Sequence, residues 1–369
     1  MMTVNIAMNK KTQPVAVMCF SSGTGGMERS AVRLAEILSE ISDVTLICKH
    51  GSFLEKLYSD GNYSFRCESV KFLSRTFSFS MLFGVRAIIN QYDIKNAIFF
   101  GASELKTLYF SFLGKNLNVT VWHGTTKSRT KRDVIHNLIY SCVNHHVAIS
   151  EHLGRNVKEI VPITKHASYR VIRPSFSFGA VQLPVNKETE RNYVNIVHVG
   201  RVASGKGQID AVLACRELHD NGVSFKLKIV GGSDGHEYLE DLKRVIGDSP
   251  YKESIFLEGF VEDVSKYLRE ANVFLFPSLG EGMPGSVIEA LYFPLICLTY
   301  KNTVFPEFQE MGFHFHMVEN GNKEMLGQKL LEICSDLDNE RELAAKNPDI
   351  ARKVFSTDRE INEWLGVLV

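Results

Sequence analysis

Two glycine-rich segments follow apolar runs and have the composition of anion-binding loops. The segment 200–207 reads Gly-Arg-Val-Ala-Ser-Gly-Lys-Gly and comes directly after the apolar run 195–199. Arg201 offers a planar fork of donors and Lys206 a point charge, so both could face one diphosphate across Gly205. The segment nearly matches the phosphate-binding pattern G-x-x-x-x-G-K-[ST], but Gly207 replaces the hydroxyl that would hold Mg²⁺. A solvated turn is the alternative interpretation.

The other segment, 21–29, reads Ser-Ser-Gly-Thr-Gly-Gly-Met-Glu-Arg and follows the apolar run 15–20. Gly25 and Gly26 would let a ligand approach the backbone at the amino end of a helix, where free N–H groups attract anions. A dinucleotide-binding fingerprint needs a third glycine at position 28, which is Glu28 here, so NAD binding is disfavoured. A tight turn between strand and helix remains the alternative.

A third motif, 281–290, places Glu281 and Glu289 around a proline-started helix. Pro284 suits a first helical turn, and the neighbouring backbone amides are left open to a ligand; they belong to Gly282, Met283 and Gly285. Carboxylates beside a phosphate site make sense as acceptors for sugar hydroxyls. Alternatively, Glu281 is a helix-start residue stabilised by the helix dipole. His123 follows another apolar run and could donate to a substrate oxygen, although a lone histidine is more often structural.

These motifs need a scaffold of alternating strands and helices, and the sequence supplies one. Short β-branched runs alternate with longer amphipathic segments throughout the 369 residues, which predicts parallel sheets covered on both faces. The pattern pauses at 173–190, which has no periodicity and is rich in Pro, Ser and Gly. We therefore predict a Rossmann-like domain over 1–178, a linker over 179–192 and a second Rossmann-like domain over 193–353. The segment 354–369 should be a terminal helix that packs back on the first domain.

Composition narrows the function classes. The hydrophobic fraction of 44% and charged fraction of 23% are those of a packed globular protein, and the formal net charge is zero, which disfavours a nucleic-acid binder. The balance is uneven, because residues 1–185 carry 22 Lys and Arg against 12 Asp and Glu, whereas residues 186–369 carry 20 against 30. The basic half would favour an anionic surface or acceptor, or the acidic half of the same chain.

The seven cysteines form no C-x-x-C pair and sit in apolar runs, so they are expected to be reduced core residues of a cytoplasmic protein and not metal ligands. No stretch is long and apolar enough for a membrane span. Two segments of the first half combine basic and apolar side chains: Lys71 and Arg75 with Phe72, Phe77, Phe79, Met81, Leu82 and Phe83, and Lys127, Arg129, Lys131 and Arg132 with Val134, Leu138 and Ile139. Such segments suit the inner face of the cytoplasmic membrane as well as a buried helix face with solvated lysines.

Taken together, the motifs resemble a retaining family 4 glycosyltransferase of the GT-B fold, in which two Rossmann-like domains with parallel sheets face a central cleft. The resemblance covers nearly the whole chain in the same order, and its most specific part is Phe276-Pro277-Ser278 running into Glu281…Glu289. Two places depart from the family pattern. Residues 173–175 read Arg-Pro-Ser instead of an Asn-Gly turn, and 302–305 lack the usual Gly-Gly pair.

The resemblance implies a nucleotide-sugar donor, UDP by family frequency, and no cofactor or metal. It implies that Arg201 and Lys206 hold the diphosphate, Glu289 the ribose and Glu281 the transferred sugar. His123 would contact that sugar, Gly25 and Gly26 would approach the diphosphate, and Phe260 and Val261 would line the base. The implied acceptor is a saccharide or lipid-linked saccharide of a bacterial surface polysaccharide or lipopolysaccharide.

Three other functions remain open on the sequence. A nucleotide-sugar 2-epimerase of related architecture would act on the donor alone. A P-loop nucleotide hydrolase would rest on residues 200–206 and release phosphate with Mg²⁺, which Gly207 argues against. A catalytically silent carbohydrate- or partner-binding protein would keep its role without Lys206 and Glu281.

Overall fold

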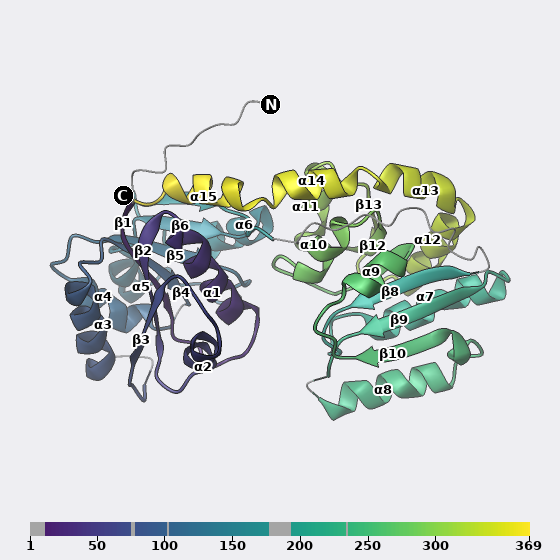
Figure 1. Ribbon diagram of the computed structural model, residues 1–369, viewed down its shortest axis with the longest axis horizontal. Helices are drawn as coiled ribbons and strands as arrows, with labels where there is room; N and C mark the ends of the chain where they lie inside the picture. Colours follow the sequence, from purple (N-terminus) through teal and green to yellow (C-terminus); the bar gives the residue numbers. More distant parts are fainter. Residues whose placement is uncertain (1–11, 75–77, 102, 177–192, 234) are drawn as a thin grey trace. The chain divides into compact units, whose positions relative to one another are not determined.

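The chain folds into two separate α/β units, which we describe individually from a computed structural model (Figure 1). The structure describes residues 12–74, 78–101, 103–176, 193–233 and 235–369, so the predicted linker over 179–192 lies outside the described residues. Unit 1 spans Met1–Pro174 and Thr357–Val369, and unit 2 spans Ser175–Ser356. The chain therefore passes between the units twice. Among the described residues, no helix is long and apolar enough to cross a membrane.

Unit 1 is built on a seven-stranded sheet with the order β3-β2-β1-β4-β5-β6-β7, in which every neighbouring pair is parallel. Its strands are β1 (Thr12–Cys19), β2 (Ser42–Lys49), β3 (Arg66–Val70), β4 (Asn96–Phe100), β5 (Asn118–His123), β6 (His145–Ala148) and β7 (Ser168–Val171). Its helices are α1 (Gly26–Ser39), α2 (Phe53–Asp60), α3 (Phe79–Gln91), α4 (Leu105–Phe112), α5 (Val134–Tyr140), α6 (Glu151–Ile160) and α15 (Thr357–Leu365).

Unit 2 repeats the arrangement with six parallel strands in the order β10-β9-β8-β11-β12-β13. Its strands are β8 (Val194–Val199), β9 (Phe225–Val230), β10 (Ile255–Gly259), β11 (Val273–Phe276), β12 (Ile296–Lys301) and β13 (Phe315–Glu319). Its helices are α7 (Gln208–Asp220), α8 (His236–Gly247), α9 (Ser265–Glu270), α10 (Gly285–Leu291), α11 (Phe305–Glu310), α12 (Lys323–Ser335), α13 (Leu337–Ala344) and α14 (Asn347–Val354), with a short 3₁₀ turn at Lys252–Ser254.

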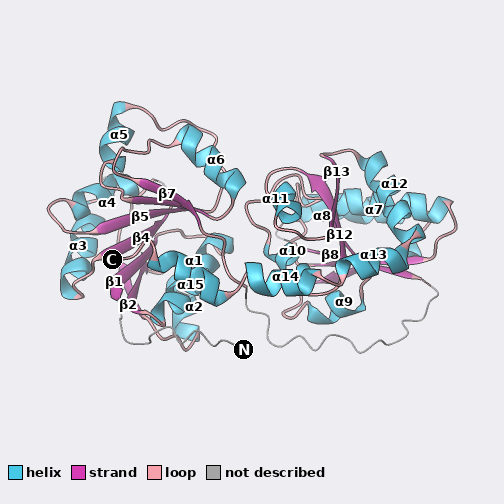
Figure 2. Cartoon of the chain, turned by 90° about the horizontal axis from the view of Figure 1, so that it is seen from above, coloured by secondary structure: helices cyan, strands magenta, loops and turns pink. Residues whose placement is uncertain are grey.

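Both sheets are buried on their two faces, which explains why their central strands are almost wholly apolar. In β8, Val194 and Ile196 belong to one core cluster, whereas Val197 and Val199 belong to another on the opposite face. Side chains alternate between the faces of a strand, so a strand covered by helices on both sides must be apolar at nearly every position. Figure 2 shows the strands of each unit running between layers of helix.

The C-terminal helix α15 completes unit 1. It lies beside α1 in both views (Figures 1 and 2), and Arg33 of α1 binds Glu360 of α15 through two hydrogen bonds of 2.6 and 3.0 Å. Trp364 is 1% exposed, and the backbone carbonyl of Val369 accepts a hydrogen bond from the Gln13 amide at 3.1 Å. A fork-to-carboxylate pair of this kind fixes geometry as well as adding energy. Unit 1 is thus assembled from two distant parts of the sequence.

The strand orders identify where each unit should bind a ligand. In unit 1 the chain places β2 and β3 on one side of β1 and then continues with β4 on the other side. In unit 2 it places β9 and β10 on one side of β8 and then continues with β11 on the other. Ligands of such sheets bind outside the carboxyl ends of the strands at this reversal point. The reversal lies between β1 and β4 in unit 1 and between β8 and β11 in unit 2. The glycine-rich segments follow β1 and β8, and the Glu281 motif follows β11.

Candidate functional site

In unit 2, the loops after β8 and β11 are hydrogen-bonded to each other and form the candidate site. Gly205 accepts hydrogen bonds through its carbonyl oxygen from the Leu279 amide at 2.9 Å and from the Ser278 hydroxyl at 3.1 Å. Gly205 has a φ of 86°, in the left-handed region that favours glycine. The two motifs that the sequence places about 75 residues apart therefore form one structural unit.

Lys206 and Glu281 form a charged pair where these two loops meet. The Lys206 Nζ lies 2.6 Å from Glu281 Oε1, and the Ser278 hydroxyl lies 2.7 Å from the same carboxylate oxygen. Their side chains are 28% and 11% exposed, so the pair is partly shielded from water yet reachable from solvent. The backbone amide of Glu281 donates to the Thr303 hydroxyl at 3.0 Å. Glu281 is thus held at both its side chain and its backbone.

The Lys206 backbone is fixed from beneath by a buried histidine. His198, in β8, is fully buried, and its Nε2 lies 3.0 Å from the Lys206 carbonyl oxygen. Burial lowers the pKa of His198 to about 4, so the ring is neutral at neutral pH. Because a carbonyl oxygen only accepts, Nε2 must carry the proton. His198 therefore adds no charge to the site. The positively charged side chains of the loop are Lys206 and Arg201.

Gly207 shows why this loop departs from the P-loop pattern. It has a φ of 82° and caps the amino end of α7, and a Cβ added there would lie 2.0 Å from the Pro277 carbonyl oxygen. A serine or threonine would collide with that backbone. The hydroxyl that a P-loop hydrolase uses for Mg²⁺ thus has no place at this position.

Glu289 lies in the second turn of α10, beyond the amino end that Pro284 caps. Burial raises the pKa of its carboxyl to about 7, with a smaller contribution from the negative charge of Asp263. A half-buried carboxyl whose pKa is raised near neutrality is a candidate ligand-binding group, because incoming hydroxyl donors would stabilise its charged form.

The remaining predicted residues of unit 2 follow the same edge of the sheet. Arg201 is exposed, and its carbonyl oxygen accepts a hydrogen bond from Gln208 Nε2 at 2.9 Å, which fixes its backbone. Phe260 is 79% exposed and Val261 packs against the core, both directly after β10. Gly282, Met283 and Gly285 are half-buried around the start of α10. These residues thus follow the carboxyl ends of the strands of unit 2, on loops or, for Gly285 and Glu289, in α10.

In unit 1, Gly25 and Gly26 are exposed at the amino end of α1, as the sequence predicts for a loop that a ligand could approach. Glu28 lies beneath the loop and is 3% exposed, and a Cβ at Gly23 would come within 2.9 Å of its Oε1. The carboxylate fills the space next to the helix terminus, where the dipole favours negative charge. The side chain that disfavoured NAD binding therefore has a packing role.

His123 lies at the end of β5 but does not reach the surface of unit 1. It is fully buried, and its Nε2 lies 3.1 Å from His146 Nδ1 of β6. Burial lowers the pKa of His123 well below its usual value, with further contributions from Lys127 and His146. The arrangement is a neutral pair of stacked imidazoles. A sugar contact by His123, as the resemblance implies, would require a rearrangement of this pair.

Sequence reasoning missed the groups that hold the site together. Ser278, His198 and Thr303 each bind a backbone or side-chain atom of the two central loops. Thr303 belongs to the loop that departs from the family pattern, yet it contacts Glu281. Ser278 belongs to the Phe276-Pro277-Ser278 motif, but nothing in the sequence indicated what its hydroxyl would contact. These residues could have been found only from the three-dimensional proximity of the loops.

A separate hollow of about 320 Å³ opens at the amino ends of the unit 2 strands. It therefore lies at the edge of the sheet opposite the candidate site and is no part of it. The side chains that line it are Tyr193, Asn195, Lys226, Lys228, Phe256 and Glu270.

Known proteins resemble this chain in both sequence and fold. Residues 184–349 match a family model described as glycosyl transferases group 1. The amylovoran biosynthesis glycosyltransferase AmsK of Erwinia amylovora is 32% identical over 149 residues, which cover 38% of this chain and 36% of that protein. A UDP-Gal:α-D-GlcNAc-diphosphoundecaprenol α-1,3-galactosyltransferase of Escherichia coli is 25% identical over 300 residues, 74% of this chain and 75% of that protein.

The chain matches only about a third of the length of the first curated relatives, 36% and 31% of them. Solved structures extend the likeness to the whole fold. A glycosyltransferase from Rickettsia africae superposes with a TM-score of 0.80 at 17% identity, over 97% of this chain and 98% of that one. Residues 184–349 thus match a glycosyltransferase family, and the two parallel-sheet units have the architecture of the GT-B fold.

Proposed function

We propose that this protein is a retaining glycosyltransferase that moves a sugar from a nucleotide-diphosphate donor, a UDP-sugar, to a saccharide or lipid-linked saccharide. The observation that carries the proposal is the joining of the Lys206 loop to the Glu281 loop at the reversal point of unit 2. Cations and carboxylates that meet at one strand edge suit a ligand with both phosphates and hydroxyls. The group 1 family match over the same residues supports this function.

The roles follow from the chemistry of each group. Arg201 and Lys206 would neutralise the diphosphate, and the backbone N–H groups of Met283 and Gly285 would add donors beside it. Glu289 would accept hydrogen bonds from the ribose, and Glu281 would accept them from the sugar. Cations placed at the leaving group stabilise charge that grows in the transition state. No metal is needed in this scheme, because two side chains supply the positive charge.

The proposed reaction breaks the bond between the anomeric carbon and the diphosphate oxygen and forms one to the acceptor hydroxyl oxygen on the same face. The acceptor proton passes to the departing phosphate oxygen, so the products are the glycoside and the nucleoside diphosphate. A double-displacement route would need a carboxylate placed as a nucleophile about 5 Å from a second one. Glu281 is already engaged by Lys206 and Ser278, which favours its use as a hydroxyl acceptor.

The experiment that tests the function is a thermal-shift screen of nucleotide sugars with and without Mg²⁺, followed by product analysis. A ligand that binds the folded state raises its apparent stability by mass action. We expect one nucleotide sugar to stabilise the protein without metal and to yield a glycoside of unchanged anomeric configuration by NMR. Turnover of the donor without an acceptor, to a 2-epimer, would instead support the epimerase. Metal-dependent phosphate release from ATP would support a hydrolase.

For the acceptor side, we propose that unit 1 meets an anionic membrane surface. Helices α3, α4 and α5 share one core cluster and lie together over one side of the sheet (Figure 1). Their outer side chains include exposed apolar groups on α3 and α5, namely Phe79, Phe83, Val134, Ile135 and Leu138.

Exposed basic side chains at Arg129 and Arg132 precede α5 directly. Apolar groups flanked by cations suit the interface of an anionic bilayer, where a lipid-linked acceptor would also be held. The apolar segments of the sequence are only partly exposed, since Phe72, Met81 and Ile139 are buried in the core.

A further inference from the structure

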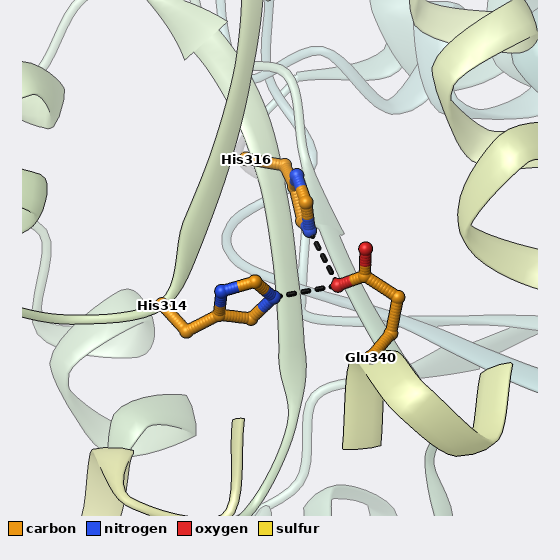
Figure 3. Close-up of side chains that lie close together, drawn as sticks. All are labelled: His314, His316 and Glu340. Atoms are coloured by element: carbon orange, nitrogen blue, oxygen red, sulfur yellow. Dashed lines mark hydrogen bonds and ion pairs between the residues drawn. The ribbon is translucent and has the colours of Figure 1, made fainter. Parts of the chain in front are cut away.

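Three potential metal ligands meet at the amino end of β13, away from the candidate donor site. His314 directly precedes β13, His316 is its second residue, and Glu340 comes from α13 (Figure 3). The Nε2 atoms of His314 and His316 lie 2.5 and 2.7 Å from the same Glu340 Oε2. One ligand atom from each of the three residues lies within 4.8 Å of the others. The cluster brings together two imidazoles and one carboxylate.

The backbone explains why these side chains converge. Residues two apart on an extended strand point to the same side, so His314 and His316 both turn toward α13. The reciprocal hydrogen bonds between the His314 backbone and the Asn347 amide measure 2.8 and 2.9 Å, and Asn347 is fully buried. Gln309 Nε2 binds the Phe315 carbonyl at 2.6 Å. The strand segment that carries both imidazoles is therefore held in place before any ligand arrives.

We propose that His314, His316 and Glu340 bind a divalent transition-metal ion of the Zn²⁺ class. Neutral imidazole nitrogens and a carboxylate oxygen are the ligands that Zn²⁺ takes, and water would complete its coordination. The three side chains are 14–17% exposed, so an ion and its water can enter from solvent. Lys329, a cation near His316, is itself paired with Glu332 at 2.8 Å.

The three side chains must rearrange to admit the ion. Ligand atoms at about 2.0–2.1 Å from a tetrahedral Zn²⁺ lie about 3.3 Å apart, so Glu340 must withdraw from each ring by less than about 1 Å. The ligand atoms of the cluster are spread over up to 4.8 Å, so the two imidazoles must also move closer together. Each Nε2 proton moves to Nδ1 through solvent, which frees the Nε2 lone pair and leaves both rings neutral.

The position of the cluster determines what the ion does. The candidate donor site follows the carboxyl ends of β8 and β11, whereas His314 and His316 lie at the amino end of the outermost strand, β13. The ion would therefore touch neither diphosphate nor sugar. It would tie β13, which has a neighbour only on the β12 side, to α13. The expected effect is stabilisation of the folded unit, independent of whether the protein is a glycosyltransferase.

The test uses the full chain without a histidine tag, dialysed against EDTA and then against metal-free buffer. Isothermal titration with Zn²⁺ at pH 7.5 should give one site per chain, and Zn²⁺ should raise the unfolding temperature. Co²⁺ should give the visible absorption of a nitrogen- and oxygen-bound ion. Saturating metal should leave the stabilisation by nucleotide sugar unchanged.

Glu340→Gln keeps an acceptor for both imidazoles and should preserve the fold, yet it should weaken Zn²⁺ binding at least about tenfold, as should His316→Gln. His236→Gln, at an exposed histidine of the same unit, is the matched control and should bind as the unchanged protein does. Absence of binding in the unchanged chain would mean that the cluster is only a hydrogen-bonded clamp. Equal binding by all the variants would mean that the ion sits elsewhere. Either result overturns the proposal.

Discussion

Lys206 Nζ and Glu281 Oε1 are 2.6 Å apart, although the two residues come from loops after different strands. A diphosphate that enters the site must compete with Glu281 for the lysine. The carboxylate is also held by Ser278, so it keeps one hydrogen bond when Lys206 turns toward a phosphate. The pair thus fixes the positions of the Lys206 ammonium and the Glu281 carboxylate before a ligand arrives.

We expect Lys206→Ala to weaken binding of the nucleotide sugar about 10- to 100-fold, because it removes a charge-assisted contact with the diphosphate. Isothermal titration with the donor found in the screen provides the measurement. Lys228→Ala is the matched control, since Lys228 pairs with Glu270 at 2.9 Å in the same unit but on the strand β9, away from the carboxyl-edge loops. Equal losses of affinity in the two variants would show that the net charge of the unit, and not a direct contact with Lys206, determines binding.

Donor binding should depend on pH through Glu289. Its carboxyl has a pKa raised to about 7 by burial, so the charged acceptor for ribose hydroxyls forms only as the pH rises through neutrality. Affinity for a nucleotide sugar should therefore increase between about pH 6 and 8. The diphosphate of such a donor is esterified at both ends and does not titrate in this range. In Glu289→Gln the pH dependence should disappear; if it persists unchanged, another group is responsible.

The raised pKa of Glu289 also makes the free energy of unfolding depend on pH. The carboxyl keeps its proton up to a higher pH in the folded protein than in the unfolded chain. Its contribution to the free energy of unfolding is therefore full below about pH 4.5 and is lost as the pH rises through 7. Urea unfolding at pH 5 and pH 8 should show a smaller decrease in stability for Glu289→Gln than for the unchanged protein.

Gly207→Ala should destabilise unit 2 more than Gly222→Ala does. Both glycines have a left-handed backbone, with φ of 82° and 70°, so both substitutions cost about 1 kcal/mol of backbone strain. Only at Gly207 would the new Cβ meet a backbone atom, the Pro277 carbonyl oxygen at 2.0 Å; at Gly222 no atom lies within 4 Å. The difference between the urea midpoints of the two variants measures the effect of this collision. Equal destabilisation would mean that the loop moves to avoid the Pro277 carbonyl oxygen.

The double substitution Phe79→Ser, Phe83→Ser should reduce binding to anionic lipid vesicles at least about tenfold. Each exposed ring that enters the bilayer interface would contribute about 2 kcal/mol to the free energy of binding. Co-sedimentation with vesicles of phosphatidylglycerol and phosphatidylcholine measures the loss, and high salt should weaken what remains. Phe256→Ser, on unit 2, changes an exposed phenylalanine outside these helices and is the control. Binding that survives the double change would place the membrane contact elsewhere.

The buried strands were predictable because burial on both faces leaves an unmistakable apolar run. The apolar run 195–199 differs from β8 by one residue, and the run 15–20 overlaps β1. The outer strands β3 and β13 have no such run, because Arg66, Glu68 and His316 interrupt their apolar pattern. A strand at the edge of a sheet is partly solvated and carries polar groups, which removes the signal. The cluster of His314, His316 and Glu340 was not predictable either, because it forms only where β13 meets α13.

The site was predictable only to the level of motifs. Position after a strand correctly placed the Lys206 and Glu281 segments at one edge, since the carboxyl ends of parallel strands share an edge. The sequence could not show that His123 is buried against His146, because the pairing of β5 with β6 brings the two rings together. Nor could it show which of Phe79 and Met81 faces water, which depends on the rotation of α3 about its axis.

The return of α15 to unit 1 has a consequence for how the protein is made. Arg33 and Glu360 are 327 positions apart, so a ribosome must synthesise all of unit 2 before the partner of Arg33 exists. Until then the nascent first domain lacks the cover that α15 and its buried Trp364 provide, so unit 1 is completed only after translation has passed α15. Unit 2, whose segments are contiguous, can fold while it waits. The order of synthesis and the order of completion are therefore reversed in this molecule.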